Sequence, residues 1–88
     1  MSENDNIWQV YIVRCADMTL YTGIALDVER RIEEHNHGRQ AARYTRARRP
    51  VTLVYSETCG SRGDAMRREI AIKKLSRVEK ELLCQQAP

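Results

Sequence analysis

The chain has 88 residues, which is enough for one compact domain and too few for a second. Its 15 Lys and Arg residues outnumber its 12 Asp and Glu residues, and the resulting net charge of +3 favours an anionic partner. No apolar run approaches the roughly 18 residues that a membrane-spanning helix needs, so we do not expect an integral membrane protein.

The start of the chain and the cysteines bear on where the protein works. The segment 1–6, MSENDN, is polar, and we expect it to be a disordered tail before a single domain over residues 7–86. It contains no apolar stretch of the kind that a secretion signal has. The three cysteines are odd in number and lack C-x-x-C spacing, which favours free thiols. These features predict a cytoplasmic protein.

The first half of the chain predicts a hairpin followed by a helix. Residues 8–15 and 20–23 are rich in β-branched and aromatic side chains and flank a turn-like segment, which is typical of two antiparallel strands. Asp27 is a suitable N-cap for a helix that ends near residue 37, because Val28, Ile32 and His35 recur at helical spacing. Gly38 supplies the stop signal.

A basic segment separates this helix from a third strand. Residues 39–49 contain five arginines and no acidic residue, and we expect a helical turn within 41–46. Pro50 ends that turn, and the β-branched and aromatic residues of 51–59 predict a strand.

Two capping boxes predict the last two helices. In each, a serine is followed three residues later by an acidic residue. The pairs are Ser61 with Asp64, for a helix over 61–75, and Ser76 with Glu79, for a helix over 76–84. The order strand, strand, helix, turn, strand, helix, helix predicts an α/β (α+β) domain with a three-stranded antiparallel sheet flanked by helices. We expect the following residues to lie in the core: Trp8, Met66, Ile70, Ile72 and Leu75.

Five chemically active residues occur at a distinctive spacing. Tyr11 in the first strand and Tyr21 in the second are ten residues apart, Arg31 follows after ten more, and His35 lies one helical turn later. Together with Glu69 on the helix after the third strand, this pattern resembles the GIY-YIG nuclease family, in particular its small stand-alone bacterial members. The resemblance covers nearly the whole chain, and it implies a metal-dependent endonuclease that hydrolyses DNA phosphodiester bonds.

The resemblance implies a role for each residue. Glu69 is the expected ligand of Mg²⁺ or Mn²⁺, hard ions that can polarise a phosphate. Arg31 offers a permanent charge and a fork of donors that matches phosphate oxygens. Tyr11 is the leading general base, and a phenol with an ordinary pKa near 10 needs nearby cationic groups to lower it. Tyr21 would orient the water or the phosphate.

Some roles stay open at the level of sequence. His35 has an ordinary pKa that suits proton transfer at neutral pH, so it is either the base itself or a group that polarises Tyr11. The family's first glycine is replaced by Gln9, and the lysine that follows the second motif in some relatives is replaced by Ile24. These departures leave open a module that binds nucleic acid without cleaving it.

The basic segment is the expected nucleic-acid contact. Arginines suit phosphates, and one exposed aromatic ring can stack on a base. The predicted contacts are Arg39, Arg43, Tyr44, Arg46, Arg48 and Arg49. Because the chain has no separate DNA-reading module, we expect single-stranded or branched DNA as substrate, while RNA and the oligomeric state stay open. The competing interpretations of the segment are a solubilising loop and a surface that binds an acidic protein.

Each site residue also has a structural interpretation. Tyr11 and Tyr21 could be ordinary cross-strand aromatics, and His35 could bind the carbonyl groups at the end of its helix. Glu69 lies four residues before Lys73, the favourable order for an ion pair on a helix. Against this, we expect Glu69 to face inward together with its apolar neighbours, where a carboxylate needs a partner.

Overall fold

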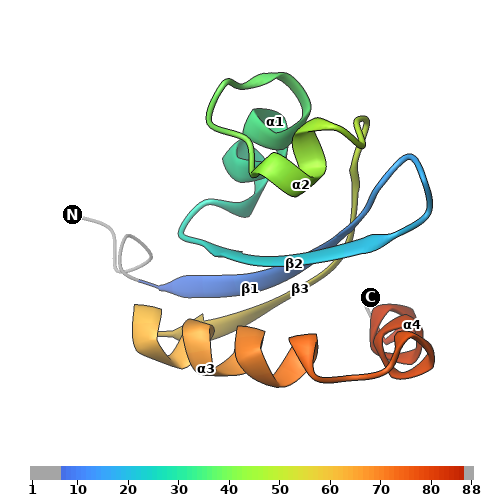
Figure 1. Ribbon diagram of the computed structural model, residues 1–88. Coiled ribbons are helices and arrows are strands. Elements are labelled where there is room, and N and C mark those ends of the chain that lie inside the picture. The colour runs from blue at the N-terminus through green and yellow to red at the C-terminus, as the bar shows by residue number, and fades with distance from the viewer. Residues whose placement is uncertain (1–6, 87–88) are drawn as a thin grey trace.

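A three-stranded antiparallel sheet separates two layers of helices (Figure 1). The computed structural model describes residues 7–86, so the predicted tail lies outside the described residues. The strands, in the spatial order β2-β1-β3, are β1 (Trp8–Arg14), β2 (Leu20–Ala25) and β3 (Thr52–Gly60). The helices are α1 (Val28–His37), α2 (Arg43–Arg46), α3 (Arg62–Lys73) and α4 (Arg77–Gln85). The predicted fold class and element order are confirmed.

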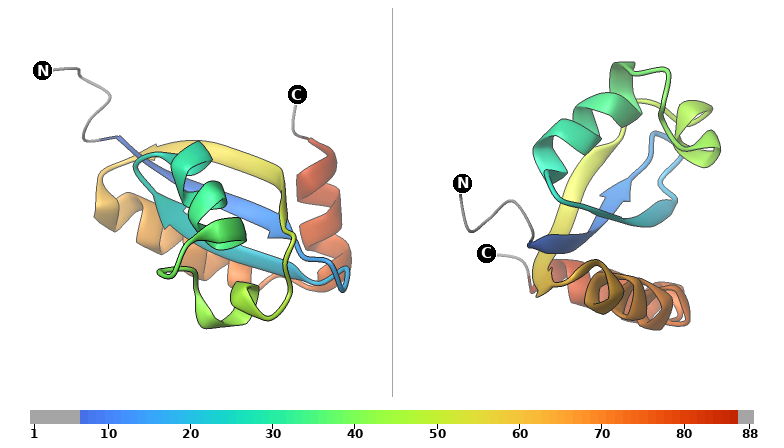
Figure 2. Two further views of the ribbon diagram at one scale, coloured as in Figure 1. Left: turned by 90° about the horizontal axis from the view of Figure 1, so that it is seen from above. Right: turned by 90° about the vertical axis from the view of Figure 1, so that its left-hand side faces the viewer.

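The helices divide between the two faces of the sheet (Figure 2). Helices α1 and α2 lie over one face, and α3 and α4 lie over the other. Because side chains of a strand alternate between faces, the central strand β1 contributes to both layers. Tyr11 and Val13 belong to the core under α1, whereas Val10 and Ile12 pack with Ile72 of α3.

Side-chain caps fix where the helices begin. Asp27 accepts a hydrogen bond from the backbone of Arg30, and both predicted capping boxes are present at α3 and α4. Gly38, which follows α1, does not adopt a left-handed backbone, because its φ is −86°. A Cβ atom there would lie 2.8 Å from the Glu34 carbonyl oxygen, so the close approach of the chain excludes a side chain.

The buried face of α3 differs from the prediction. Met66 is 39% exposed and Ile70 is 51% exposed, so the prediction that both are core residues is wrong. The stripe that faces the sheet instead runs through Ala65 and Ile72, both 0% exposed, with Glu69 between them at helical spacing. The prediction that Ile72 is a core residue is confirmed. Trp8 and Leu75 are partly buried.

The cysteines are unpaired, as the sequence predicts. Cys15 is buried, and Cys59 and Cys84 are partly buried in the core beneath α3 and α4. Within residues 7–86, no helix combines the length and the apolar character that crossing a membrane requires.

Candidate active site

The phenol of Tyr11 extends across the edge strand of the sheet. Tyr11 on β1 is the direct partner of Gly23 on β2. A Cβ atom on Gly23 would lie 2.5 Å from the Tyr11 hydroxyl oxygen, so only glycine leaves room for the ring. Gly23 of the Tyr21-Thr22-Gly23 motif therefore makes room for the side chain of Tyr11 on the neighbouring strand.

A buried chain of hydrogen bonds starts at this phenol. The Tyr11 hydroxyl lies 2.7 Å from Nε2 of His35, and Nδ1 of the same ring lies 2.7 Å from the Thr45 hydroxyl. Tyr11 is 1% exposed, and His35 and Thr45 are fully buried. The chain links β1, α1 and α2, and it shows that His35 does not bind the carbonyl groups at its helix end.

Burial keeps both ionisable groups of this chain neutral. It raises the pKa of Tyr11 to about 12, although the nearby guanidinium of Arg31 opposes the shift. Burial also lowers the pKa of His35 to about 4, and the positive charges of Arg31 and Arg49 act in the same direction. Arg31 does lower the pKa of Tyr11, as expected of a cationic neighbour, but desolvation outweighs it and the net shift is upward.

Arg31 lies beside Tyr11 and His35 and is still partly accessible. As predicted from their spacing, Arg31 and His35 occupy one face of α1. The Arg31 side chain is 27% exposed, and its Nη1 atom donates a 3.0 Å hydrogen bond to the Gln40 carbonyl. The carboxylate of Glu34 lies 3.6 Å away. The guanidinium also interacts with the Tyr11 hydroxyl, and its remaining donors are available to an anion.

Tyr21 connects the buried chain to the basic segment. Its ring meets the His35 ring edge-on, with centroids 5.5 Å apart, and stacks on the Tyr44 ring at 5.9 Å. The guanidinium carbon of Arg48 lies 3.8 Å from the centre of the Tyr44 ring. Tyr44 is thus held by two partners within the protein, and its predicted role in stacking on a base remains a prediction.

Glu69 approaches from the other layer. Its side chain is 21% exposed and forms a 3.4 Å ion pair with Lys73, the structural alternative that the sequence allows. Its negative charge is the smallest of the causes that raise the pKa of Tyr11, so the carboxylate lies within electrostatic range of the phenol. The site therefore combines side chains from both faces of the sheet.

The residues around Glu69 fit one particular mode of metal binding. Across the described chain, no group of three or more His, Cys, Asp or Glu side chains could enclose a metal ion. Mg²⁺ commonly retains several waters and binds one or two carboxylates together with substrate phosphates. A single, largely buried carboxylate beside a cluster of phosphate-compatible donors fits that mode and does not fit a cage made by the protein alone.

Two of the five arginines in the basic segment hold the backbone in place. Arg49 donates to the carbonyl groups of Glu34, His35 and Gly38 and so caps the end of α1. Arg46 donates to the carbonyl of Arg39. These contacts give Arg49 a structural role, so it is not among the nucleic-acid contacts that we propose.

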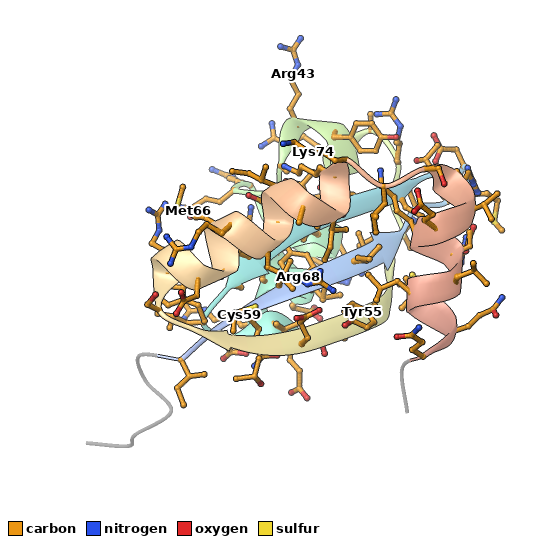
Figure 3. All side chains as sticks on the ribbon, turned by 90° about the horizontal axis from the view of Figure 1, so that it is seen from below. Arg43, Tyr55, Cys59, Met66, Arg68 and Lys74 are labelled. Atoms are coloured by element: carbon orange, nitrogen blue, oxygen red, sulfur yellow. The ribbon has the colours of Figure 1, made fainter. Side chains whose placement is uncertain are left out.

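The other three arginines of the basic segment differ in whether their side chains have partners within the protein. Arg48 forms a 2.9 Å salt bridge with Asp17 and also donates to the Tyr44 carbonyl. Arg39 and Arg43 are exposed, and within the described part of the chain neither side chain has a hydrogen-bond or ion-pair partner. Figure 3 shows Arg43 pointing away from the body of the molecule. These two are the arginines most available to a phosphate backbone.

Thr45 is the site residue that the sequence analysis missed as such. In the sequence it stands between Tyr44 and Arg46, two predicted nucleic-acid contacts. The available signal was a short polar residue within a short helical turn whose other side chains are two arginines and a tyrosine. Its contact with His35, ten residues earlier, depends on how α2 folds back over α1.

Comparisons with known proteins identify related chains. The sequence pattern of the GIY-YIG catalytic domain matches residues 7–81. A UPF0213 protein of Desulfotalea psychrophila is 60% identical over 76 residues, which cover 86% of this chain and 69% of that protein. A UPF0213 protein of Halobacterium salinarum is 54% identical over 74 residues, covering 84% of this chain and 95% of the relative. The names of these relatives state no activity.

Two solution NMR structures share the fold. A UPF0213 protein of Bacillus halodurans is 44% identical with a TM-score of 0.57, and the match covers 90% of this chain and 83% of that one. A protein of E. faecalis is 30% identical with a TM-score of 0.58, and that match covers 96% and 90% of the two chains.

Proposed function

Because the chain belongs to the GIY-YIG catalytic domain family, we propose that it is an endonuclease that hydrolyses DNA phosphodiester bonds with Mg²⁺ or Mn²⁺. The observation that carries this proposal is the buried 2.7 Å hydrogen bond between Tyr11 and His35, with Arg31 beside it. A partly accessible guanidinium next to a proton-accepting chain is what attack of water on a phosphate requires.

Proton transfer divides between Tyr11 and His35. With a pKa of about 12, Tyr11 keeps its proton at neutral pH. Tyr11 and His35 are both buried, but the Tyr11 hydroxyl also interacts with the partly accessible Arg31, which makes it the end of the chain nearer to a bound phosphate. In the proposed step, a water oxygen bonds to phosphorus and its proton passes to the Tyr11 oxygen, while the Tyr11 proton moves to Nε2 of His35. The bond from phosphorus to the 3′ oxygen breaks, its electron pair stays on that oxygen, and the resulting alkoxide takes a proton from solvent to become the 3′ hydroxyl. In this proposal Tyr11 takes the proton of the attacking water, which the bound substrate would bring to it, and His35 is the final acceptor.

Two charged side chains deal with the phosphate. Arg31 stabilises the negative charge that builds on the phosphate oxygens, a contribution of a few kcal/mol in comparable sites. Glu69 would hold the divalent ion together with the bound substrate, and the ion supplies Lewis-acid stabilisation of the departing oxygen. Lys73 competes for the same carboxylate, so we expect metal binding to be tight only when the substrate is present.

The substrate follows from the shape of the basic segment. Helix α2 has four residues, too few to lie along a major groove as a recognition helix. The available Arg39 and Arg43 suit the backbone of a flexible or splayed strand. This supports single-stranded or branched DNA as the proposed substrate, with RNA as the competing polymer.

A cleavage panel tests the proposal. Single-stranded, duplex and forked DNA and single-stranded RNA of one sequence are incubated with Mg²⁺, Mn²⁺ or EDTA. We expect forked or single-stranded DNA to be cut only with metal, and Arg31→Ala and Glu69→Gln each to lower the rate at least about 100-fold. Arg30→Ala is the matched control, because Arg30 is exposed on the outer side of α1. Metal-independent cutting, or full activity of Glu69→Gln, would contradict the proposal.

A module that binds nucleic acid without cleaving it is the second candidate. The 3.4 Å ion pair of Glu69 with Lys73 favours it, because the pair satisfies the carboxylate without a metal. Fluorescence anisotropy separates the candidates. Binding of labelled oligonucleotides by wild-type protein, with no product at any metal concentration, would select the second.

A further inference from the structure

We propose that Thr45 is a positioning residue that fixes which nitrogen of His35 carries the proton, so that Nε2 is free to accept the proton of Tyr11. This inference rests on the proposed function for its catalytic consequence. The tautomer itself can be measured whether or not the protein cleaves DNA.

The hydrogen bonds around Thr45 determine the tautomer. The Thr45 hydroxyl has one proton to donate, and it lies 3.0 Å from the carbonyl oxygen of Ala42, which can only accept. Its proton is therefore committed to Ala42, and its oxygen accepts from Nδ1 of His35 at 2.7 Å. A neutral imidazole has a single N–H, so a proton on Nδ1 leaves a lone pair on Nε2.

The other end of the ring completes the argument. Nε2 lies 2.7 Å from the Tyr11 hydroxyl, the group that must lose a proton in the proposed step. In the opposite arrangement Nε2 would donate to the Tyr11 oxygen and occupy a lone pair that water needs. Because His35 and Thr45 are fully buried, bulk water does not compete for these atoms.

Thr45 suits this task better than a more flexible residue. It is β-branched, which restricts its side-chain rotamers, and its bond to the carbonyl three residues earlier fixes the hydroxyl further. The backbone N–H of Arg46 donates to the same Ala42 carbonyl, so the acceptor is held in place as well. Thr45 thereby links the geometry of α2 to the proton acceptor on α1.

Nitrogen NMR of the imidazole tests the inference. The protein contains two histidines, and His37→Gln removes the exposed one and leaves His35 as the only imidazole signal. In this background we expect Nδ1 to show the shift of a protonated nitrogen at pH 7 and Nε2 that of an unprotonated one. Thr45→Ser should preserve the pattern, and Thr45→Val, which removes the hydroxyl at nearly constant shape, should give a mixture of tautomers.

Kinetics provide the second measurement. With saturating forked DNA and Mg²⁺, we expect Thr45→Val to lower kcat about 100-fold, the lower end of the contribution of a positioned proton acceptor, and to leave KM within about threefold. Thr45→Ser should recover most of the loss. Thr58→Val, on the exposed side of β3, controls for the loss of any threonine hydroxyl.

The outcomes separate this inference from the proposed function. A proton on Nε2 in the background protein, or an unchanged Nδ1 signal in Thr45→Val, would overturn the tautomer assignment. If the wild-type protein cleaves none of the substrates, the nuclease proposal fails while the NMR result still decides the assignment. If Thr45→Val unfolds, the wild-type tautomer and Thr45→Ser remain as the test.

Discussion

Neither Tyr11 nor His35 is a good base when considered alone. Moving a proton from a phenol with a pKa of about 12 to an imidazole with a pKa of about 4 is strongly unfavourable. Two features of a bound substrate reduce this cost. Tyr11 regains a proton from water in the same step, and the phosphate charge offsets Arg31, which is the second cause of the lowered pKa of His35. The basicity of His35 therefore depends on the substrate.

The lowered pKa of His35 predicts acid sensitivity of the folded state. The unfolded chain binds a proton on this imidazole below about pH 6.5, whereas the folded protein does so only near pH 4. The free energy of unfolding should therefore be greatest above pH 6.5 and fall between pH 6.5 and 4, by on the order of 2–3 kcal/mol for full burial. Urea unfolding across this range measures it.

Two glutamine variants isolate this contribution. His35→Gln should show a shallower decline between pH 6.5 and 4 than the wild type, although it is less stable at pH 7. His37→Gln should keep the wild-type slope, because His37 is exposed beside Glu33. Equal slopes in all three proteins would show that His35 titrates normally in the folded state.

At the scale of elements, local signals predicted more than packing signals did. The caps at Asp27, Ser61 and Ser76 depend on residues three positions apart, and the structure confirms all three. The inward face of α3 depends on which side chains fit against a sheet distant in sequence. Apolar character predicted the buried Ile72 correctly, but it also pointed to Met66 and Ile70, which are exposed.

The basic segment illustrates the same limit. Its composition predicted phosphate contacts for every arginine, but the ends of helices leave carbonyl groups that also need donors. Arg49 satisfies those of α1, and Arg46 satisfies that of Arg39. Which arginines remain available depends on where the chain folds back, and the sequence alone does not determine this.

Arg49 and Arg43 should therefore respond in opposite ways to replacement by alanine. Arg49→Ala leaves carbonyl groups at the end of α1 unsatisfied and should lower the free energy of unfolding by about 1–3 kcal/mol. Arg43→Ala should change stability by less than about 0.5 kcal/mol. It should instead weaken oligonucleotide binding and reduce the salt slope by about one. Urea unfolding and anisotropy titrations at several salt concentrations make the comparison, and weak binding with unchanged stability for Arg49→Ala would reverse the assignment.

At the scale of the whole molecule, the site depends on both layers of the fold. Tyr11, Arg31 and His35 belong to the layer of α1, while Glu69 belongs to α3 on the opposite face. The spacing of these residues in the sequence predicted that they come from different elements. It did not reveal that the carboxylate comes from the other side of the sheet, because that depends on how each helix crosses it.

The position of Glu69 then depends on how α3 is anchored, and two isoleucines test the anchor. Ile72 is fully buried against β1, whereas Ile70 is 51% exposed on the same helix. Ile72→Ala should lower the free energy of unfolding by about 2–5 kcal/mol through lost burial and a cavity. Ile70→Ala makes the same chemical change and should cost less than about 1 kcal/mol.

In a domain of this size both layers should unfold together, so the fluorescence of Trp8 on β1 and far-UV circular dichroism should report one midpoint in each variant. Separate midpoints in Ile72→Ala would mean that α3 detaches while the sheet persists, and Glu69 would then be lost from the site before the protein unfolds.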